Sequence, residues 1–410
     1  MRRWFATPLW QRILLAILLG ALAGWLLGER AAQIKWIGDL FIRLIRMMVV
    51  PLVLAMIITG VAALGDPRRL GTMGGRTIGL LIAMTALAVC VGLGLGTWLQ
   101  PGAGVQLGAV GAGTPAVARP IAEQLLAIVP VNPFAAIAGG EMLSIIFFAM
   151  AIGLGALLVG ERGRPLVALA EGAAAIMLRL VHLFMELAPF GVFALIAATV
   201  GTHGLAVFGT LFWLAAALVI GTLFQIFVVQ AGLVAVVARY PIGRYFRGIV
   251  EAVLMAFSTT SSAATLPTTM KVAEEKLHLG KPIASAAIPL GVGIARDGTA
   301  VYVGLLTMFA AQIYGVALAP GDYAVLVLAA TLLALGAAGV PSAALFMLTG
   351  VMSMIGVDDL QTAAIVAFIL PFDRLLDMVR TVPNVTANLA VATTVARWEG
   401  ELDLERKPHA

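Results

Sequence analysis

Charged residues are scarce in this chain. They make up 11% of its 410 residues, whereas 61% are hydrophobic. Because soluble domains carry about 25% charged residues, the composition excludes an ordinary soluble protein. The apolar runs also lack the alternating pattern of an outer-membrane barrel. The sequence therefore predicts an all-α polytopic membrane protein, whose helices satisfy their own backbone hydrogen bonds within lipid.

Cysteine is nearly absent as well. Cys90 stands alone, so an intrachain disulfide framework is excluded. The formal net charge of +5 is small, and basic loops at one membrane face account for it without a nucleic-acid partner. We expect no cofactor and no resident metal.

Long apolar runs fill the first part of the chain. They predict six spans, near residues 11–28, 37–64, 77–99, 134–160, 166–200 and 206–237. Arginines gather before the first span and after the second, fourth and sixth, at Arg2, Arg3, Arg68, Arg69, Arg76, Arg162, Arg164, Arg239, Arg244 and Arg247. The opposite connections hold fewer basic residues, although Arg30 and Lys35 follow the first span. The positive-inside rule then predicts that both termini are cytoplasmic.

Two later stretches contain small or polar residues between apolar arms. The first interruption, 258–265, lies within about 248–272, and the second, 336–343, lies within 323–356. Each arm is too short to cross a hydrocarbon core of about 30 Å. We therefore expect two re-entrant helical hairpins beside a binding site near the membrane midplane, between inverted repeats. Kinked helices packed against their neighbours are the alternative.

Between these hairpins, residues 283–311 predict a helix that breaks at 291–299. An unwound centre exposes carbonyl groups and helix ends, which suits ions. Arg296 and Asp297 are adjacent there, so a structural ion pair between them is a second interpretation.

The last helix, expected over 358–397, carries charges at membrane depth. Asp373, Asp377, Arg380 and Asn384 are spaced i, i+4, i+7 and i+11, so they share one face. A central Asp or Arg costs about 2.5–3.5 kcal/mol on insertion scales. This polar stripe is expected to face a site rather than lipid.

Several motifs resemble those of the glutamate transporter family, the dicarboxylate/amino acid:cation symporters, and the resemblance covers nearly the whole chain. The motifs are Ser261-Ser262-Ala263-Ala264-Thr265-Leu266-Pro267, Asp297-Gly298-Thr299-Ala300, Gly339-Val340-Pro341 and the run from Asp377 to Thr386. The resemblance implies a secondary active transporter of a prokaryotic inner membrane and not an enzyme.

The same resemblance implies eight transmembrane helices plus two re-entrant hairpins, in a homotrimer surrounded by membrane lipid. A static scaffold, expected in residues 1–65 and 130–201, would hold a transport domain that moves like an elevator. That domain would comprise residues 70–99 and 205–400.

The resemblance also assigns substrate contacts. Arg380 would bind the substrate's side-chain carboxylate, for which a planar guanidinium suits bidentate pairing, and Asp377 would bind the α-ammonium. This pair favours L-aspartate or L-glutamate over a dicarboxylate without an amine. The remaining contacts would come from Thr381, Asn384, Ser261, Ser262, Thr299 and Val340.

Many relatives carry a second arginine, at positions that are Thr260 and Met378 here. Arg374 lies one helical turn before Asp377, so we expect it to stand in for that arginine, with Asp373 in support.

The coupling-ion residues depart from the sodium-coupled pattern. An asparagine ligand is Ala295 here, an aspartate ligand is Asn388, and two third-helix positions are Leu81 and Met84. Thr85 retains a hydroxyl group near the third-helix positions, and Gly291, where the helix begins to break, is a further candidate for the ion site. The resemblance thus suggests sodium-independent transport, in which Arg296 takes the electrostatic role of Na⁺ beside Asp297.

Proton coupling is favoured over plain exchange. Because a guanidinium does not release its proton, a buried carboxylate is the expected carrier, with Asp297, Asp373, Asp377 and Glu141 as unranked candidates. The alternatives are a sodium-coupled symporter with a reduced ion set, an amino-acid exchanger and, as a different class, an anion channel. An intramembrane hydrolase is disfavoured because no histidine shares a comparable polar segment with Ser261 and Ser262.

Overall fold

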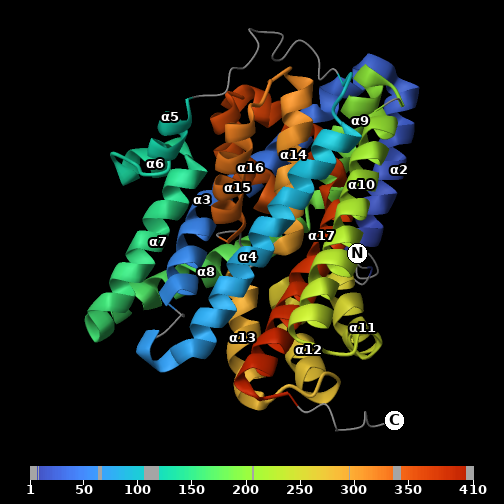
Figure 1. Cartoon of the computed structure of the whole chain (residues 1–410). Helices are drawn as coiled ribbons and strands as arrows, with labels where there is room; N and C mark the ends of the chain where they lie inside the picture. Colours follow the sequence, from blue (N-terminus) through green and yellow to red (C-terminus); the bar gives the residue numbers. More distant parts are fainter. Residues whose placement is uncertain are drawn as a thin grey trace.

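The computed structural model describes residues 7, 9–62, 67–105, 120–205, 207–294, 296–335 and 343–402. The regular elements of these ranges are helices (Figure 1), and their one β pairing is an isolated bridge between Leu279 and Leu402. Four stretches of the described chain are long and apolar enough to cross a membrane: Gln11–Ala62, Thr72–Leu99, Met142–Met185 and Phe208–Val237. The all-helical membrane class is confirmed.

A first group of helices packs mainly within itself. Its members are α2 (Leu9–Leu27), η1 (Gly28–Ile34), α3 (Lys35–Ala62), α7 (Met142–Val159), α8 (Arg164–Met185) and α9 (Ala188–His203). Small residues let α2 and α9 approach closely, because a Cβ added at Gly20 would lie 2.7 Å from the carbonyl oxygen of Phe193. Three short helical segments lie near them: α5 (Ile121–Leu126), which packs against α15 (Pro320–Leu335), α6 (Pro133–Gly139), which packs against α7, and η2 (Gly160–Gly163), which joins α7 to α8.

Two spans expected as single helices are interrupted. The span 134–160 divides into α6 and α7 at Gly140, whose φ of 71° is left-handed and favours glycine. The span 166–200 divides into α8 and α9 just before Pro189, which lacks a backbone donor and therefore suits the first turn of a new helix.

A second group contains the elements that surround the charged helix. It comprises α4 (Pro67–Leu99), α10 (Val207–Phe224), the π-helical turns η3 (Gln225–Gln230) and η4 (Leu233–Val237), and all helices that follow. The longest is α17 (Asp359–Glu399), which begins with a capping box between Asp358 and Gln361.

The first expected hairpin consists of α11 (Ile242–Thr259) and α12 (Ser262–Glu275). Thr260 ends α11 with a left-handed φ of 54°, and the Ser261 hydroxyl accepts a hydrogen bond from the Ala264 N–H at 3.2 Å. The small hydroxylated run therefore closes a tight tip, because its side chains cap the backbone.

The second expected hairpin corresponds to α15 (Pro320–Leu335) and α16 (Ala343–Met352), followed by η5 (Ser353–Ile355). Val340, predicted to contact substrate, lies outside the described residues. In Figure 1, α15 and α16 occupy the upper end of the molecule, α11 and α12 occupy the lower end, and α17 runs between them. The two helix pairs thus approach the middle from opposite ends.

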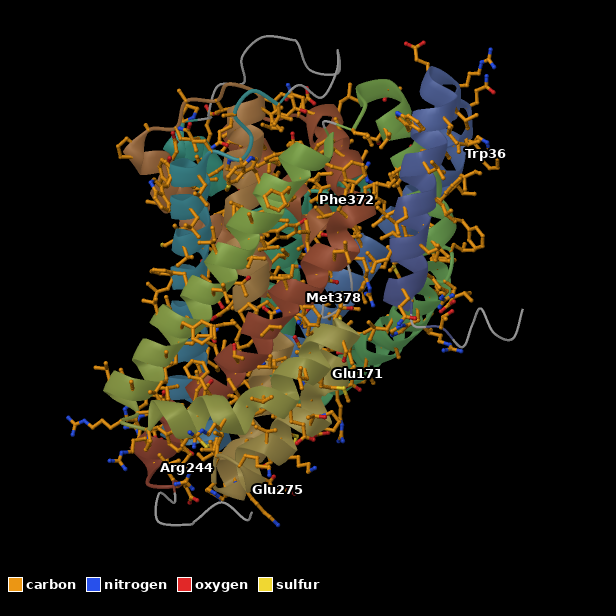
Figure 2. The ribbon with its side chains drawn as sticks, turned by 90° about the vertical axis from the view of Figure 1, so that its right-hand side faces the viewer. Trp36, Glu171, Arg244, Glu275, Phe372 and Met378 are labelled. Atoms are coloured by element: carbon orange, nitrogen blue, oxygen red, sulfur yellow. The ribbon has the colours of Figure 1, made fainter. Side chains whose placement is uncertain are left out.

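The helix expected to break is divided into α13 (Lys281–Ile294) and α14 (Asp297–Ile313), and Ala295 between them lies outside the described residues. Figure 2 shows Met378 of α17 at mid-height, with Arg244 and Glu275 of the first hairpin at the lower end. Buried apolar side chains form two clusters. Along α17, the last residue of one cluster is Leu376, and the first residue of the other is Val385. The polar stretch of α17 lies between these two cores.

Candidate functional site

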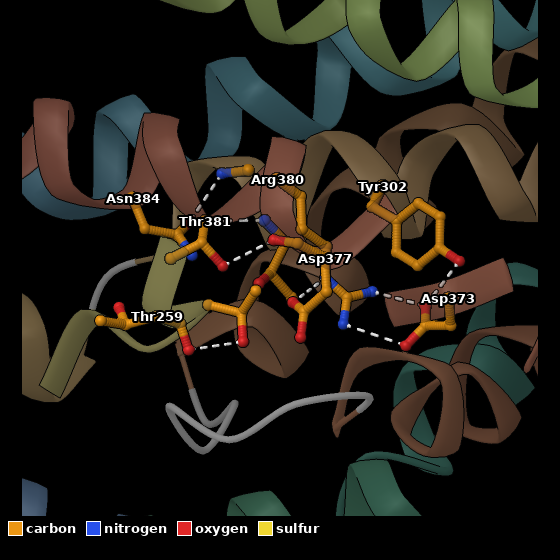
Figure 3. A network of polar contacts seen from close by, with 10 residues as sticks. Thr259, Tyr302, Asp373, Asp377, Arg380, Thr381 and Asn384 are labelled. Carbon is orange, nitrogen blue, oxygen red and sulfur yellow. Dashed lines mark hydrogen bonds and ion pairs between the residues drawn. The ribbon is translucent and has the colours of Figure 1, made fainter. Parts of the chain in front are cut away.

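The charged face of α17 forms a buried ion-pair network. The Arg380 Nη1 and Nη2 atoms lie 3.1 and 3.4 Å from the two carboxylate oxygens of Asp373, and its Nε lies 2.7 Å from Asp377 Oδ1 (Figure 3). Arg380 is 2% exposed and Asp373 is fully buried. Helical spacing of seven and three residues brings the three groups onto one face, as the sequence pattern predicts.

Tyr302 of α14 completes this network, although it is not among the residues expected from the sequence. Its hydroxyl donates to Asp373 Oδ1 at 2.9 Å, and its ring centre lies 4.6 Å from the guanidinium carbon of Arg380. The ring face attracts the cation while the hydroxyl orients the carboxylate. A signal was present, because Tyr302 follows Thr299 by three residues and so shares its face of α14.

Several buried polar atoms beside the network have no hydrogen-bond partner among the described residues. They are Asp377 Oδ2, Ser262 Oγ, and the Nε and Nη1 atoms of Arg374. Buried polar atoms are nearly always paired, so such exceptions need an explanation. An acceptor and several donors without partners are what a site for a zwitterionic, carboxylate-bearing ligand requires.

Thr381 and Asn384 connect α17 to its surroundings. The Thr381 hydroxyl donates to the Asp377 carbonyl at 2.7 Å. Asn384 Oδ1 accepts from the backbone N–H of Gly298 at 2.7 Å and of Thr299 at 3.4 Å, so it caps the first turn of α14. The close approach requires Gly298, because a Cβ there would collide with the Arg380 carbonyl oxygen.

Asp297 begins α14 and is fully buried. Its Oδ2 accepts from the side-chain amides of Gln225 at 2.8 Å and Gln230 at 3.1 Å, and Thr85 donates to its Oδ1 at 3.4 Å. The structure therefore places Thr85, one of the ion-site candidates, against Asp297, and it adds two glutamines that are not among the residues expected from the sequence.

Arg296 is 3% exposed, and its Nη2 donates to the Val292 carbonyl at 3.0 Å. That carbonyl belongs to the last turn of α13, where the helix dipole presents partial negative charge. The guanidinium thus lies at a helix end that would also attract a metal cation.

Asn388 lies against Gly291, where an added Cβ would collide with Asn388 Oδ1. Neither polar atom of the Asn388 amide has a partner within the described chain. No group of three or more His, Cys, Asp or Glu residues that could hold a metal occurs in the described ranges.

Comparison with known proteins gives one consistent result. A model of the sodium:dicarboxylate symporter family matches residues 9–398. The chain is 36% identical to the proton/sodium-glutamate symport protein of Bacillus subtilis, over 96% of this chain and 92% of that protein. It is 34% identical to the proton/glutamate-aspartate symporter of Escherichia coli, over 97% and 94% of the two chains. It is also 33% identical to the C4-dicarboxylate transport protein of Azorhizobium caulinodans, over 98% and 91%.

Proposed function

The chain belongs to the sodium:dicarboxylate symporter family, and we propose that it is a secondary active transporter of acidic amino acids, L-aspartate or L-glutamate. One observation carries the substrate class. A buried guanidinium, Arg380, lies beside a buried carboxylate oxygen, Asp377 Oδ2, that has no partner among the described residues. A substrate with both a carboxylate and an ammonium group complements this pair.

Binding requires an exchange of partners at Arg380. The contacts of Arg380 with Asp373, at 3.1 and 3.4 Å, are longer than its 2.7 Å contact with Asp377. The substrate's side-chain carboxylate therefore replaces Asp373 at Nη1 and Nη2, and Asp373 keeps the Tyr302 hydroxyl. The substrate ammonium binds Asp377 Oδ2, and its α-carboxylate binds Ser261 and Ser262, together with Val340, which the resemblance assigns to the same contact.

Relatives named for C4-dicarboxylate transport make that activity the second candidate. A dicarboxylate without an amine would leave Asp377 Oδ2 buried and unpaired, which costs about 1–3 kcal/mol. This difference favours the amino acid. Arg374, whose Nε and Nη1 atoms also lack partners within the described residues, supplies further positive charge for either substrate.

Transport in this proposal is independent of sodium, with protons as the favoured coupling ion. Support comes from Ala295 and Asn388 at positions where sodium-coupled relatives carry ligands, and from the Arg296 guanidinium at the end of α13. Na⁺ prefers several oxygen ligands, whereas this end of α13 already accepts a hydrogen bond from a protein cation. The carrier of the coupled proton is a buried carboxylate, with Asp297, Asp373 and Asp377 as candidates. Glu141, the fourth carboxylate expected from the sequence, is exposed and does not meet this condition.

The mechanism proposed is an elevator movement of the second group of helices against the first. Each group packs mainly within itself, and an apolar cavity of about 280 Å³ lies between α3 and α7 on one side and α4, α13 and α15 on the other. Loose packing at that boundary lowers the resistance to sliding. Figure 2 shows Arg244 and Glu275 well below Glu171 of α8, so the second group projects beyond the first at the arginine-rich end.

We assign that arginine-rich end to the cytoplasm, which gives both termini a cytoplasmic location in a bacterial inner membrane. The assembly proposed is a homotrimer held by the first group of helices. The apolar side chains that α8 leaves exposed, among them Leu169, Ile176 and Leu183, suit contact with a second copy or with lipid.

Uptake of labelled L-aspartate into proteoliposomes that contain the full chain tests the substrate assignment. We expect L-glutamate to compete strongly, succinate weakly and L-alanine not at all. Arg380→Cys should lose aspartate uptake, and its substrate preference should shift towards neutral amino acids. Arg164→Cys makes the same change at an exposed ion pair with Glu161 and should leave uptake unchanged. Undiminished uptake of labelled aspartate by Arg380→Cys would contradict the proposal.

A further inference from the structure

The helix that follows α10 changes its winding where it faces Asp297. Residues Gln225–Gln230 form the π-helical turn η3, with hydrogen bonds that run from residue i to i+5. In an α-helix, residues five apart point about 140° away from each other, at 100° per residue. The wider π turn instead brings Gln225 and Gln230 onto nearly the same face. Such turns occur frequently at functional sites.

Both side chains converge on one atom. Gln225 Nε2 and Gln230 Nε2 donate to Asp297 Oδ2 at 2.8 and 3.1 Å, and both glutamines are fully buried. Thr85 donates to the other carboxylate oxygen. Within the described chain, this buried carboxylate thus accepts hydrogen bonds from three neutral donors that lie on two other helical segments.

The amide orientations follow from the charge of Asp297. Rotating either amide by 180° would point its oxygen at a carboxylate oxygen, which is repulsive. Gln225 holds its orientation although its Oε1 has no hydrogen-bond partner among the described residues. Leaving a buried acceptor unpaired is unfavourable. The Gln225 side chain is instead held through its Nε2, which donates to Asp297 Oδ2 at 2.8 Å and, at the longer distance of 3.4 Å, to the Met84 carbonyl.

We propose that Gln225 and Gln230 give Asp297 the positive electrostatic complement that a bound cation would otherwise give, so that the broken helix closes without Na⁺. The proposal rests on the sodium-independent transport proposed above. The two amides replace the cation at the carboxylate, and Arg296 replaces it at the end of α13. Gln225 and Gln230 are positioning residues, because they act on the substrate site through Asp297 and α14.

The path from this carboxylate to the substrate site is short. Asp297 is the first residue of α14, and the next two backbone N–H groups bind Asn384 of α17. Gln230 also binds α17 directly, since its Nε2 donates to the Pro383 carbonyl at 3.0 Å and its Oε1 accepts from the Thr386 hydroxyl at 2.6 Å. Loss of the amides should therefore loosen α14 against the turn of α17 that carries Arg380.

Thermal unfolding of the purified full chain, without substrate, tests the amide–carboxylate interaction. The buffers are choline chloride and sodium chloride at equal ionic strength. We expect the Gln225→Leu/Gln230→Leu variant to lose several degrees of Tm in choline. Adding Asp297→Asn to this variant should recover most of the lost Tm, because the triple variant no longer buries an uncompensated charge. Sodium should stabilise the double variant and leave the unsubstituted chain unchanged.

Gln312 provides a matched control. Its amide donates to the Gly96 carbonyl at 2.7 Å and accepts from the Gly102 N–H at 2.8 Å, so it binds backbone and no carboxylate. The Tm lost in Gln312→Leu should not return when Asp297→Asn is added. The double variant could fail to fold. In that case, folding of the variant that also carries Asp297→Asn supports the proposal, and failure of both variants to fold contradicts it.

The outcomes separate this proposal from the proposed function. Additive losses from the glutamine and Asp297 substitutions would show that the glutamines only fill space, and the inference would be wrong whatever the transport ion is. Non-additive losses of Tm together with sodium-driven uptake by the unsubstituted chain would give a different result. The amide–carboxylate interaction would stand, but its role as a cation substitute and the sodium independence of transport would both be overturned.

Discussion

Asp377→Asn tests the division of labour in the substrate site. The substitution is nearly isosteric, and the asparagine oxygen still accepts the hydrogen bond from Arg380 Nε that Asp377 Oδ1 accepts now at 2.7 Å. It removes the negative charge and replaces Oδ2, the acceptor without a partner in the described chain, by an N–H donor. Arg380 and Asp373 stay in place, so the carboxylate-binding half of the site is preserved.

The expected magnitude follows from the lost ammonium contact. A hydrogen bond to a charged group contributes about 1.5–3 kcal/mol, so the Kd for L-aspartate should rise about 10- to 150-fold. Succinate lacks the ammonium and gains relief from an unpaired buried carboxylate oxygen. Its affinity should therefore stay the same or improve.

Equilibrium binding of both ligands to the same purified sample measures this difference, and succinate serves as the internal control for folding. We expect the ratio of the affinities for aspartate and succinate to collapse or invert. An equal loss of affinity for the two ligands would refute the assignment of Asp377 to the ammonium group.

Two further substitutions test the surroundings of Arg380. Tyr302→Phe keeps the ring over the guanidinium but removes the hydroxyl that holds Asp373, so Asp373 should compete more strongly for Arg380. For a hydrogen bond of about 0.5–1.5 kcal/mol, aspartate should bind about 2- to 13-fold more weakly. Isothermal titration that gives an unchanged Kd would contradict this role. Gly298→Ala places a Cβ against the Arg380 carbonyl and should lower the free energy of unfolding by about 1–3 kcal/mol, which a lower Tm would report. In the control Gly209→Ala the added Cβ has open space, so its Tm should not fall. Equal Tm values for the two variants would show that the α14–α17 approach is not tight.

The sequence predicted the parts of the site that depend on α-helical spacing. Asp373, Asp377 and Arg380 recur at intervals that fit one face of an α-helix, and the structure joins them in one network. The turn between α11 and α12 was also predictable, because residues 258–265 are rich in hydroxyl side chains that cap helices. Local chemistry determines both features.

Other features depend on tertiary structure. Gln225 and Gln230 are five residues apart, so an α-helical pattern assigns them to different faces, and only the π turn brings them together. Tyr302 shares the face of Thr299 on α14, but its hydrogen bond to Asp373 depends on how α14 packs against α17, which the spacing does not determine. The direction of the Arg296 side chain, toward Val292, likewise follows from the broken helix and not from its neighbour in sequence.

Uptake of labelled L-aspartate into proteoliposomes under a single imposed ion gradient tests the central claim most directly. An inward proton gradient without sodium should concentrate aspartate, and a proton ionophore should abolish that accumulation. An inward sodium gradient at equal pH on both sides should have no effect. Accumulation that follows the sodium gradient and ignores the proton gradient would contradict the account.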